Sequence, residues 1–420
     1  MSFDRFSLHP DLLKGVHDLG FTEPTKIQEA AIPPARDGRD VLACAMTGSG
    51  KTAAFLLPLL HRLQSQPRGV TRVLVLAPTR ELAAQIDAHR AELSRHTRLT
   101  GAPVFGGVGM GPQETAFRRG VDVIVATPGR LLDHMSQPYA RLSHLSALVL
   151  DEADRMLDMG FLPDIRRILA VLPKQRQNLL FSATMPPAIA TLARELLKDP
   201  VSFDVERPAA PATGVAQAVY PVAEELKPAL LLELLKRGDV TNALAFTRTK
   251  HRANRLHDFL AKNGIVCDRI HGNRSQAQRT QALEAFKNGT TRVLVATDIA
   301  ARGIDVTALP HVVNVDVPHV PEDYIHRVGR TARAERTGDA LTFVSPAEET
   351  DLKAIERAIG RRLSRLTLPG FDYAHRPSDR FEVPIAERIA AIRARKAGER
   401  ARARERADRR ALNERRRASG

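Results

Sequence analysis

The chain has few of the residues that would place it in a membrane or an oxidising compartment. Its 420 residues include two cysteines, Cys44 and Cys267, and no tryptophan. Two distant cysteines provide neither a disulfide framework nor the spacing of a zinc site. The apolar run from Ala53 to Leu60 is among the longest, yet it contains Pro58 and is too short to span a bilayer. Since the N-terminal residues also lack the apolar stretch of a signal peptide, we expect a soluble, cytoplasmic protein with no membrane contact.

Acidic residues are fewer than basic ones, and the basic excess is uneven. The chain carries 63 Lys and Arg against 48 Asp and Glu, a net charge of +15. The segment Ala386–Gly420 holds 13 Lys and Arg against 5 Asp and Glu, a net charge of +8 in 35 residues. An arginine-rich tail of this kind favours a polyanionic partner such as nucleic acid. The alternative is a solubilising tail that has no specific partner.

Two domains and a tail account for the length of the chain, which exceeds what one hydrophobic core organises. The segment Arg207–Gly214 is rich in Pro, Ala and Gly and has no apolar period, which is typical of a linker. We therefore predict a first domain over residues 1–205, a linker over 206–214, a second domain over 215–365 and a basic low-complexity tail over 366–420.

Both halves alternate short apolar runs with helical patterns. Near-continuous apolar strands separated by helices are typical of a parallel sheet that helices cover on both faces, so we predict an α/β protein with two such sheets. Strands are expected at residues 41–44, 72–77, 121–126, 147–150 and 178–181, and then at 242–247, 265–270, 292–297, 311–317 and 339–344. Polar residues follow several of these strands, where open α/β sheets bind their ligands.

A glycine-rich loop follows the first of these strands and precedes a helix expected over Thr52–Leu63. In Gly48-Ser49-Gly50-Lys51-Thr52 the glycines allow backbone N–H groups to approach a phosphate. Lys51 would reach the outer phosphates, and the Thr52 hydroxyl can ligate magnesium. Ala45 stands where the general pattern has its first glycine. The alternative is a purely structural turn, but a strand before the loop and a helix after it favour phosphate binding.

Two acidic residues follow the buried strand at 147–150. Asp151 would hold the hydration shell of a magnesium ion, and Glu152 would orient and deprotonate the attacking water. The alternative is that these carboxylates only cap the helix that follows. A phosphate loop and an acidic pair, in this order and a domain's length apart, together predict a nucleoside triphosphatase.

The four residues from Asp151 to Asp154 read D-E-A-D, and the chain resembles the DEAD-box ATP-dependent RNA helicases from residue 1 to about residue 360. The resemblance implies two tandem RecA-like domains that bind ATP and Mg²⁺. The segment Gly20–Gln28 is similar to the family's Q motif, which implies that Gln28 reads adenine and that Phe21 or Phe3 flanks it. An amide side chain can both donate to and accept from the adenine edge. The implied contacts of the phosphate loop are Ala45, Met46, Thr47, Gly48, Ser49, Gly50, Lys51 and Thr52, with Met46 replacing a frequent Gln.

Further short segments match the elements with which this family holds the RNA backbone. Hydroxyls, helix N-termini, closely approaching glycines and arginines hold phosphates without reading bases. The resemblance implies RNA contacts for Pro78, Thr79, Arg80, Gly106, Gly107, Thr127, Arg130, Arg248, Gln276, Arg279 and Thr297. It also implies that Asp154, Ser182, Thr184 and His326 couple the two ligand sites.

The second half contains no second phosphate loop, so we expect it to bind no nucleotide of its own. The segment His326–Arg333 matches the family's last motif, which implies that Arg330 and Arg333 are arginine fingers when the domains close. The resemblance also implies that Asp305 accepts hydrogen bonds from the ribose hydroxyls. The alternatives are a basic surface helix for the arginines and a turn residue for Asp305.

The activity that the resemblance implies is RNA-dependent ATP hydrolysis that separates short duplexes or displaces bound proteins. An RNA clamp with negligible hydrolysis and a DNA-directed motor are the alternatives, because composition predicts a polyanion and does not distinguish RNA from DNA. Two runs, Asp151–Phe161 and His311–Pro318, look like the bacterial RhlE-type group. Members of that group are linked to ribosome assembly and RNA decay, so factors of those pathways are expected partners.

The tail generates a first prediction, that it tethers RNA through charge alone. Each phosphate that a protein neutralises steepens the decline of affinity with salt. RNA affinity should therefore fall more steeply with salt in the full chain than in a chain that ends near Leu366. Binding titrations over a series of salt concentrations measure both slopes, and equal slopes would remove this role of the tail.

Overall fold

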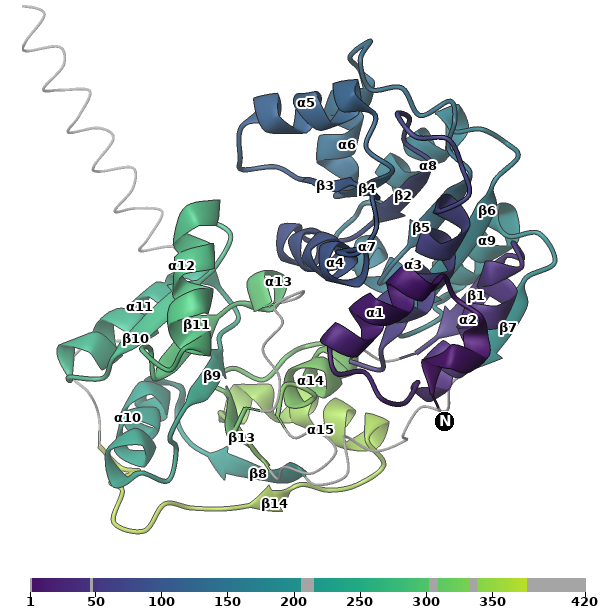
Figure 1. Ribbon diagram of the computed structural model, residues 1–420. Helices are drawn as coiled ribbons and strands as arrows, with labels where there is room; N and C mark the ends of the chain where they lie inside the picture. Colours follow the sequence, from purple (N-terminus) through teal and green to yellow (C-terminus); the bar gives the residue numbers. More distant parts are fainter. Residues whose placement is uncertain (1, 46–47, 205–214, 302–308, 332–337, 376–420) are drawn as a thin grey trace, which may run out of the picture.

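The computed structural model describes residues 2–45, 48–204, 215–301, 309–331 and 338–375. These residues form two lobes, and each lobe is built on one seven-stranded sheet whose paired strands all run parallel (Figure 1). This confirms the predicted α/β architecture of two parallel sheets flanked by helices. The predicted linker at 206–214 lies outside the described residues.

The first sheet lies within the first 204 residues. Its strands are β1 (Val41–Cys44), β2 (Val73–Leu76), β3 (Gly101–Val104), β4 (Val123–Ala126), β5 (Ala147–Leu150), β6 (Gln177–Ser182) and β7 (Val201–Asp204). Their order across the sheet is β3-β4-β2-β5-β6-β1-β7. Strand β3 was not predicted, because its sequence contains Gly101 and Pro103. It lies at the edge of the sheet, where a proline removes little of the hydrogen-bond ladder.

Helices cover both faces of the first sheet because its inner strands are apolar on both sides. In β2, Val73 and Val75 pack into one core with Phe55, whereas Leu74 and Leu76 pack into the other with Met156. The first face carries α1 (Pro10–Asp18), α2 (Lys26–Arg36), α3 (Lys51–Leu63) and α4 (Arg80–Leu93). The second face carries α5 (Met110–Arg119), α6 (Pro128–Met135), α7 (Ala153–Asp158), α8 (Leu162–Val171) and α9 (Pro187–Leu196).

The second sheet repeats the first. Its strands are β8 (Val215–Pro221), β9 (Ala243–Phe246), β10 (Cys267–Ile270), β11 (Val293–Ala296), β12 (His311–Asn314), β13 (Gly338–Val344) and β14 (Ser364–Arg365). Their order is β10-β11-β9-β12-β13-β8-β14, which is the first order with every number raised by seven. Strand β8 therefore holds the place of β1, and β12 holds the place of β5.

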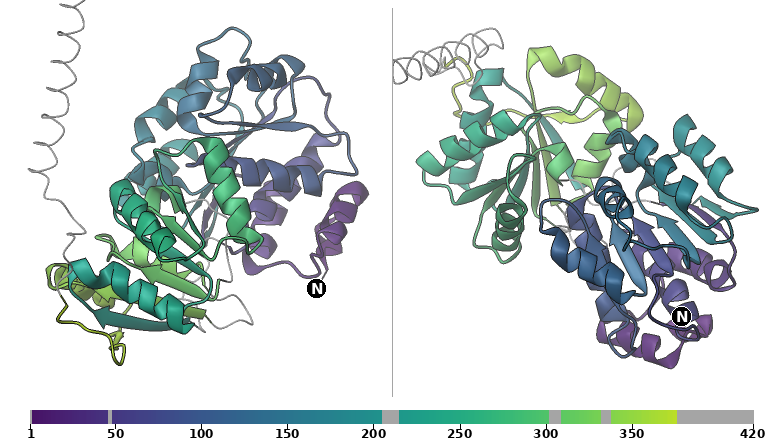
Figure 2. Two further views of the ribbon diagram at one scale, coloured as in Figure 1. Left: turned by 90° about the vertical axis from the view of Figure 1, so that its left-hand side faces the viewer. Right: turned by 90° about the horizontal axis from the view of Figure 1, so that it is seen from above.

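Among the residues that the structure describes, two helices cover one face of the second sheet and four cover the other. The first face carries α10 (Lys227–Arg237) and α11 (Lys250–Lys262). The second carries α12 (Gln276–Lys287), α13 (Asp298–Ala301), α14 (Pro321–Val328) and α15 (Glu349–Ala358). Figures 1 and 2 show the two lobes side by side, with α12, α13 and α14 on the side of the second lobe that faces the first.

The residues just after β14 also pack against the second sheet. Leu368 lies in the core below β8, and Phe371 and Tyr373 pack against it. The Leu366 N–H donates to Val219 O at 2.8 Å. The shortened chain of the salt experiment should therefore end at His375, so that this packing is kept. In the described part of the chain, no helix combines the length and the apolar character that crossing a membrane requires.

Candidate active site

The predicted phosphate and acidic residues meet at the carboxyl edge of the first sheet. Strands β5, β6 and β1 are neighbours in that order. Asp151 follows β5, Ser182 ends β6, and Lys51 begins α3 after the loop that leaves β1. Because parallel strands end at the same edge, three segments that are far apart in sequence share one site.

The glycines of the phosphate loop take conformations that other residues avoid. Gly48 has φ +84° and Gly50 has φ +93°. Lys51 is 6% exposed, and its Nζ donates to Ala45 O at 2.9 Å, so the ammonium closes the loop on itself. Met46 and Thr47 lie outside the described residues.

Gln28 joins α2 to the phosphate loop. Its Oε1 accepts from the Thr25 N–H at 2.9 Å, and its Nε2 donates to Gly50 O at 3.1 Å. A Cβ on Gly50 would lie 2.6 Å from that Nε2, so a glycine is needed there for space as well as for φ. Phe3 is buried and stacks on Phe21 with ring centroids 6.2 Å apart. The structure thus brings Gln28 to the phosphate loop, whereas Phe3 and Phe21 contact each other.

Asp151 is the least compensated carboxylate of the site. Burial raises the pKa of Asp151 to about 6, although Lys51 opposes this shift. Its Oδ1 has no hydrogen-bond partner among the described residues. A buried carboxylate oxygen without a donor, near enough to Lys51 of the phosphate loop to feel its charge, fits a Mg²⁺ ligand shell.

Glu152 has an unusual backbone and a partner that leads to the other lobe. Its φ of +54° is left-handed, a conformation that is uncommon outside glycine. Its Oε2 accepts from Arg155 Nη1 at 2.8 Å, and both side chains are buried. Arg155 Nη2 lies 3.2 Å from His326 Nδ1 of α14 in the second lobe. Sequence reasoning missed Arg155, whose three-residue spacing from Glu152 was the available signal.

Asp154 meets the predicted coupling residues. Its Oδ2 accepts from the Thr184 N–H at 2.8 Å and from Thr184 Oγ1 at 2.9 Å, and its own N–H donates to Ser182 Oγ at 3.1 Å. Burial alone would raise the pKa of Asp154, but the Thr184 hydroxyl, Lys51 and the Ser182 hydroxyl together lower it. The carboxylate is therefore ionised and fixed between α7 and the end of β6.

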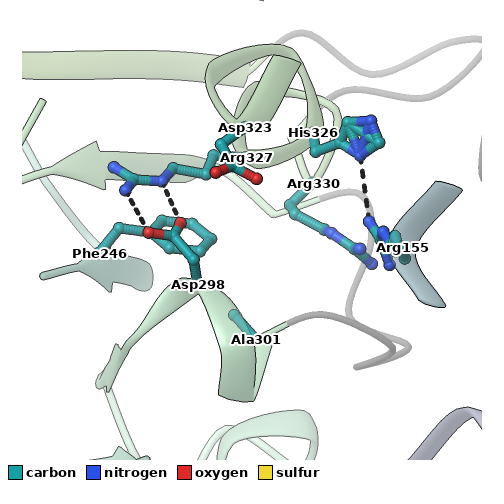
Figure 3. A pocket seen from close by; sticks show the side chains of 8 residues that line it. All are labelled: Arg155, Phe246, Asp298, Ala301, Asp323, His326, Arg327 and Arg330. Atoms are coloured by element: carbon teal, nitrogen blue, oxygen red, sulfur yellow. Dashed lines mark hydrogen bonds and ion pairs between the residues drawn. The ribbon is translucent and has the colours of Figure 1, made fainter. Parts of the chain in front are cut away.

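Arg330 lines a pocket between the lobes, together with Arg155, His326 and Arg327 (Figure 3). Arg327 pairs with Asp298 through two hydrogen bonds of 2.6 and 2.7 Å, and its guanidinium lies 4.9 Å from the centroid of the Phe246 ring. Figure 3 shows this pair on one side of the pocket and His326 facing Arg155 on the other. Arg333 and Asp305 lie outside the described residues.

Two arginines among the candidate RNA contacts of the first lobe lie against the loop that follows β3. The Arg80 guanidinium lies over the Gly106-Gly107 backbone, so that a Cβ on Gly107 would approach its Nη1 to 2.1 Å. Arg130 Nη1 donates to Val108 O at 3.1 Å. Thr79 caps α4 and Thr127 precedes α6, while Pro78 is buried after β2.

The candidate RNA contacts of the second lobe fall into two places. Gln276 Nε2 donates to Glu81 Oε1 at 2.9 Å, and Arg279 Nη2 lies 3.0 Å from the same oxygen, so both contact the first lobe. Arg248 follows β9 and donates to Glu348 Oε1 at 2.9 Å. Thr297 is buried at the start of α13. Arg248 and the pair on α12 therefore contact different carboxylates, Glu348 and Glu81.

Comparison with protein families gives two matches along the chain. Residues 25–192 match the model of the DEAD/DEAH box helicases, and residues 226–335 match the helicase conserved C-terminal domain. The DEAD-box ATP-dependent RNA helicase CshA of Bacillus subtilis is 41% identical over 374 residues, which cover 89% of this chain and 76% of that protein.

Solved structures give the same relation. Yeast (S. cerevisiae) Dbp5 bound to RNA and ADP BeF3 is 32% identical, with a TM-score of 0.78 over 87% of this chain and 95% of that one. A variant of Dbp5 bound to Nup159, a Gle1 variant, IP6 and ADP is 31% identical, with a TM-score of 0.60 over 86% and 96%. The TM-score therefore differs between two forms of Dbp5 that carry different ligands and partners.

The raised pKa of Asp151 predicts that the variant Asp151→Asn is more stable in the absence of metal and nucleotide. Since the folded pKa of about 6 exceeds the ordinary value of 3.8, folding penalises the charged form. This penalty is complete above the folded pKa and fades as the pH falls toward the unfolded value. Denaturant unfolding at pH 8 should show a gain of up to about 3 kcal/mol, which shrinks by pH 4.5. A loss of stability at pH 8 would contradict the assignment of an uncompensated charge.

Proposed function

The chain belongs to the family of DEAD-box ATP-dependent RNA helicases, and we propose that its two lobes hydrolyse one ATP between the phosphate loop and the pocket that Arg155, His326 and Arg330 line. The family is shown by two domain matches and by a 41% identical relative. The protein is accordingly an ATP-hydrolysing helicase. The roles of individual residues are the proposal, and the hydrogen-bonded chain from Glu152 through Arg155 to His326 carries it.

In the first lobe, the phosphate loop holds the triphosphate. ATP would draw the Lys51 ammonium from Ala45 O to the outer phosphates, because an ionised acceptor binds it more strongly than a carbonyl. Gln28, Phe21 and Phe3 face the adenine. Thr52 and Asp151 would hold Mg²⁺, which would neutralise charge on the phosphates. Glu152 orients the attacking water and accepts its proton.

In the second lobe, Arg330 and Arg333 stabilise the charge that develops on the transferring phosphate. Arg327 is not a finger, because Asp298, Asn314 and the Asp316 carbonyl take up its donors. It holds α14 on the sheet and so fixes the position of Arg330. Asp305 contacts the ribose. His326 links the segment His326–Arg333 to Glu152 through Arg155. Asp154, Ser182 and Thr184 complete the coupling between the two ligand sites.

RNA lies across both lobes and is held by its backbone. Arg80, Gly106, Gly107 and Arg130 supply the surface of the first lobe, together with Pro78, Thr79 and Thr127. Arg248, Thr297, Gln276 and Arg279 continue it on the second. The similarity to Dbp5 is higher for the form bound to RNA and ADP BeF3 than for the form bound to Nup159. That difference supports a closed arrangement here, one that ATP and RNA each favour and through which each strengthens the other.

Domain bounds and cellular context are also part of the proposal. We place the first domain at residues 1–205, the linker at 206–214 and the second domain at 215–365. The residues up to His375 pack onto the second domain, and the basic tail follows them. The curated relative carries the name CshA, so the expected RhlE-type subgroup is not confirmed. A cytoplasmic site of action, with ribosome-assembly or RNA-decay factors as partners, stays a prediction.

The test of the catalytic assignment is Glu152→Gln. The amide keeps the shape of the side chain but accepts no proton, so RNA-stimulated ATP turnover should fall at least about a hundredfold. ATP-dependent RNA binding should persist, because the fingers and the phosphate loop are unchanged. Phosphate release and fluorescence anisotropy with single-stranded RNA measure the two properties.

The matched control is Asp158→Asn, which neutralises an exposed carboxylate later in the same helix. It should leave turnover unchanged. Turnover of the Glu152 variant near the wild-type rate would remove Glu152 from the role of base. Negligible hydrolysis by the wild-type chain, with or without RNA, would instead favour the clamp, and stronger stimulation by single-stranded DNA than by RNA would favour the DNA motor.

A further inference from the structure

The second lobe contains a buried ionic cluster at the same place in the sheet as the ATP site of the first lobe. Lys227 begins α10 after β8, just as Lys51 begins α3 after β1. Asp316 stands two residues after the end of β12, just as Glu152 stands two residues after the end of β5. Strands β8 and β12 hold the places of β1 and β5 in the strand order, so the two lysines lie at equivalent helix starts. His311 pairs with Ala243 of β9 as Ala147 pairs with Val73 of β2, which puts Asp316 at the register of Glu152. The sequence alone does not indicate that Lys227 corresponds to Lys51, because the loop before Lys227 has no glycines.

Three carboxylates of the chain itself surround this second lysine, and the most distant of them is Asp316, whose Oδ1 lies 3.7 Å from Lys227 Nζ. Lys227 is 0% exposed, and its Nζ lies 2.9 Å from Glu224 Oε2 and 2.5 Å from Glu348 Oε2. Glu224 stands three residues before Lys227, at the position that Gly48 holds before Lys51. The place that glycine leaves open for phosphate in the first lobe therefore carries a negatively charged side chain in the second.

The cluster is balanced by cations of the chain. Arg252 Nη2 lies 2.5 Å from Glu224 Oε1 and 2.6 Å from Asp316 Oδ1. Burial opposes ionisation of Glu224, but Lys227 and Arg252 outweigh it and lower its pKa. Glu224, Asp316 and Glu348 come close enough together to hold a metal ion. Lys227 and Arg252 already contact these carboxylates, so the charges are compensated without one.

Glu348 connects the cluster to a proposed RNA contact. Its Oε2 also accepts from Ser345 Oγ at 2.8 Å, and its Oε1 accepts from Arg248 Nη2 at 2.9 Å and from the Val317 N–H at 3.2 Å. The Arg248 N–H donates to Asp316 Oδ2 at 2.7 Å. The Arg248 side chain is 38% exposed, so its guanidinium is held from within while it remains accessible to a ligand.

We propose that the second lobe contains a self-filled copy of the phosphate site, in which Glu348 and Glu224 replace the phosphate on Lys227, and that Glu348 positions Arg248 for the RNA backbone. The inference rests on the proposed role of Arg248 in RNA binding. Glu348 is a positioning residue, because it acts on RNA only through Arg248. A guanidinium held by an ionised acceptor loses less side-chain freedom when RNA binds, and this preorganisation raises affinity.

The experiment is a double-mutant cycle on RNA-stimulated ATPase activity. It compares Glu348→Gln, Arg248→Ala and the double variant that carries both substitutions. Each single variant should raise the half-saturating RNA concentration about three- to tenfold and leave kcat at saturating RNA within about twofold. The double variant should be no worse than Arg248→Ala alone, because Glu348 has nothing left to position. Multiplied effects in the double variant would overturn the proposal.

Two further variants separate positioning from loss of stability. Glu356→Gln breaks another ion pair of the same lobe, between Glu356 and the exposed Arg365, and should leave the half-saturating RNA concentration unchanged. If Glu348→Gln does not fold, Lys227→Met combined with Glu348→Leu removes one cation and one anion together, and it should raise the half-saturating concentration like Arg248→Ala.

The outcomes also separate this proposal from the proposed function. A normal half-saturating concentration in Arg248→Ala would mean that Arg248 does not bind RNA, and the positioning role would fall with it. A raised concentration in Arg248→Ala together with a normal one in folded Glu348 variants would overturn the positioning role alone and leave the RNA contact standing.

Discussion

The hydrogen bonds of Arg155 are the interaction on which the account of this molecule depends. This buried guanidinium donates to Glu152 in its own lobe and lies 3.2 Å from the His326 ring of the other lobe. The carboxylate proposed to activate water is therefore held by a group whose second partner is present only when the lobes are together. When the lobes separate, Arg155 loses its contact with His326, and water that reaches the guanidinium weakens its attraction to Glu152. Separation of the lobes should thus disturb the catalytic carboxylate directly.

The two sheets use the same edge for opposite purposes. In the first, glycines leave space beside Lys51, and Asp151 has an oxygen without a donor, so the site is poorly compensated until ligands arrive. In the second, Glu224 and Glu348 already neutralise Lys227. Charge balance thus explains why the edge of the first sheet can bind a triphosphate, whereas the edge of the second sheet has its charges paired within the protein. It also gives the second lobe a rigid support for Arg248.

Much of the fold could be predicted from the sequence, because parallel strands buried on both faces are continuous apolar runs such as Val73–Leu76. The phosphate loop and acidic residues were predictable from short spacings. The Arg155–His326 contact was not, since 171 residues separate its partners and neither motif indicates the other. Lys227 and Glu348 were missed for a similar reason, because their relation appears only once β8 and β12 take the places of β1 and β5. Strand β3 was not predicted, because glycine weakens a strand and proline is tolerated mainly in an edge strand.

The most direct test measures the distance between the lobes in the chain and in Arg155→Gln. Labels at Val171 and Val266, which are 67% and 60% exposed, report that distance by energy transfer once Cys44 and Cys267 are replaced. With single-stranded RNA and a non-hydrolysable ATP analogue, the original chain should populate one closed distance, whereas Arg155→Gln should remain distributed over open ones. A variant that closes as completely as the original chain would contradict the claim that Arg155 joins the catalytic carboxylate to the second lobe.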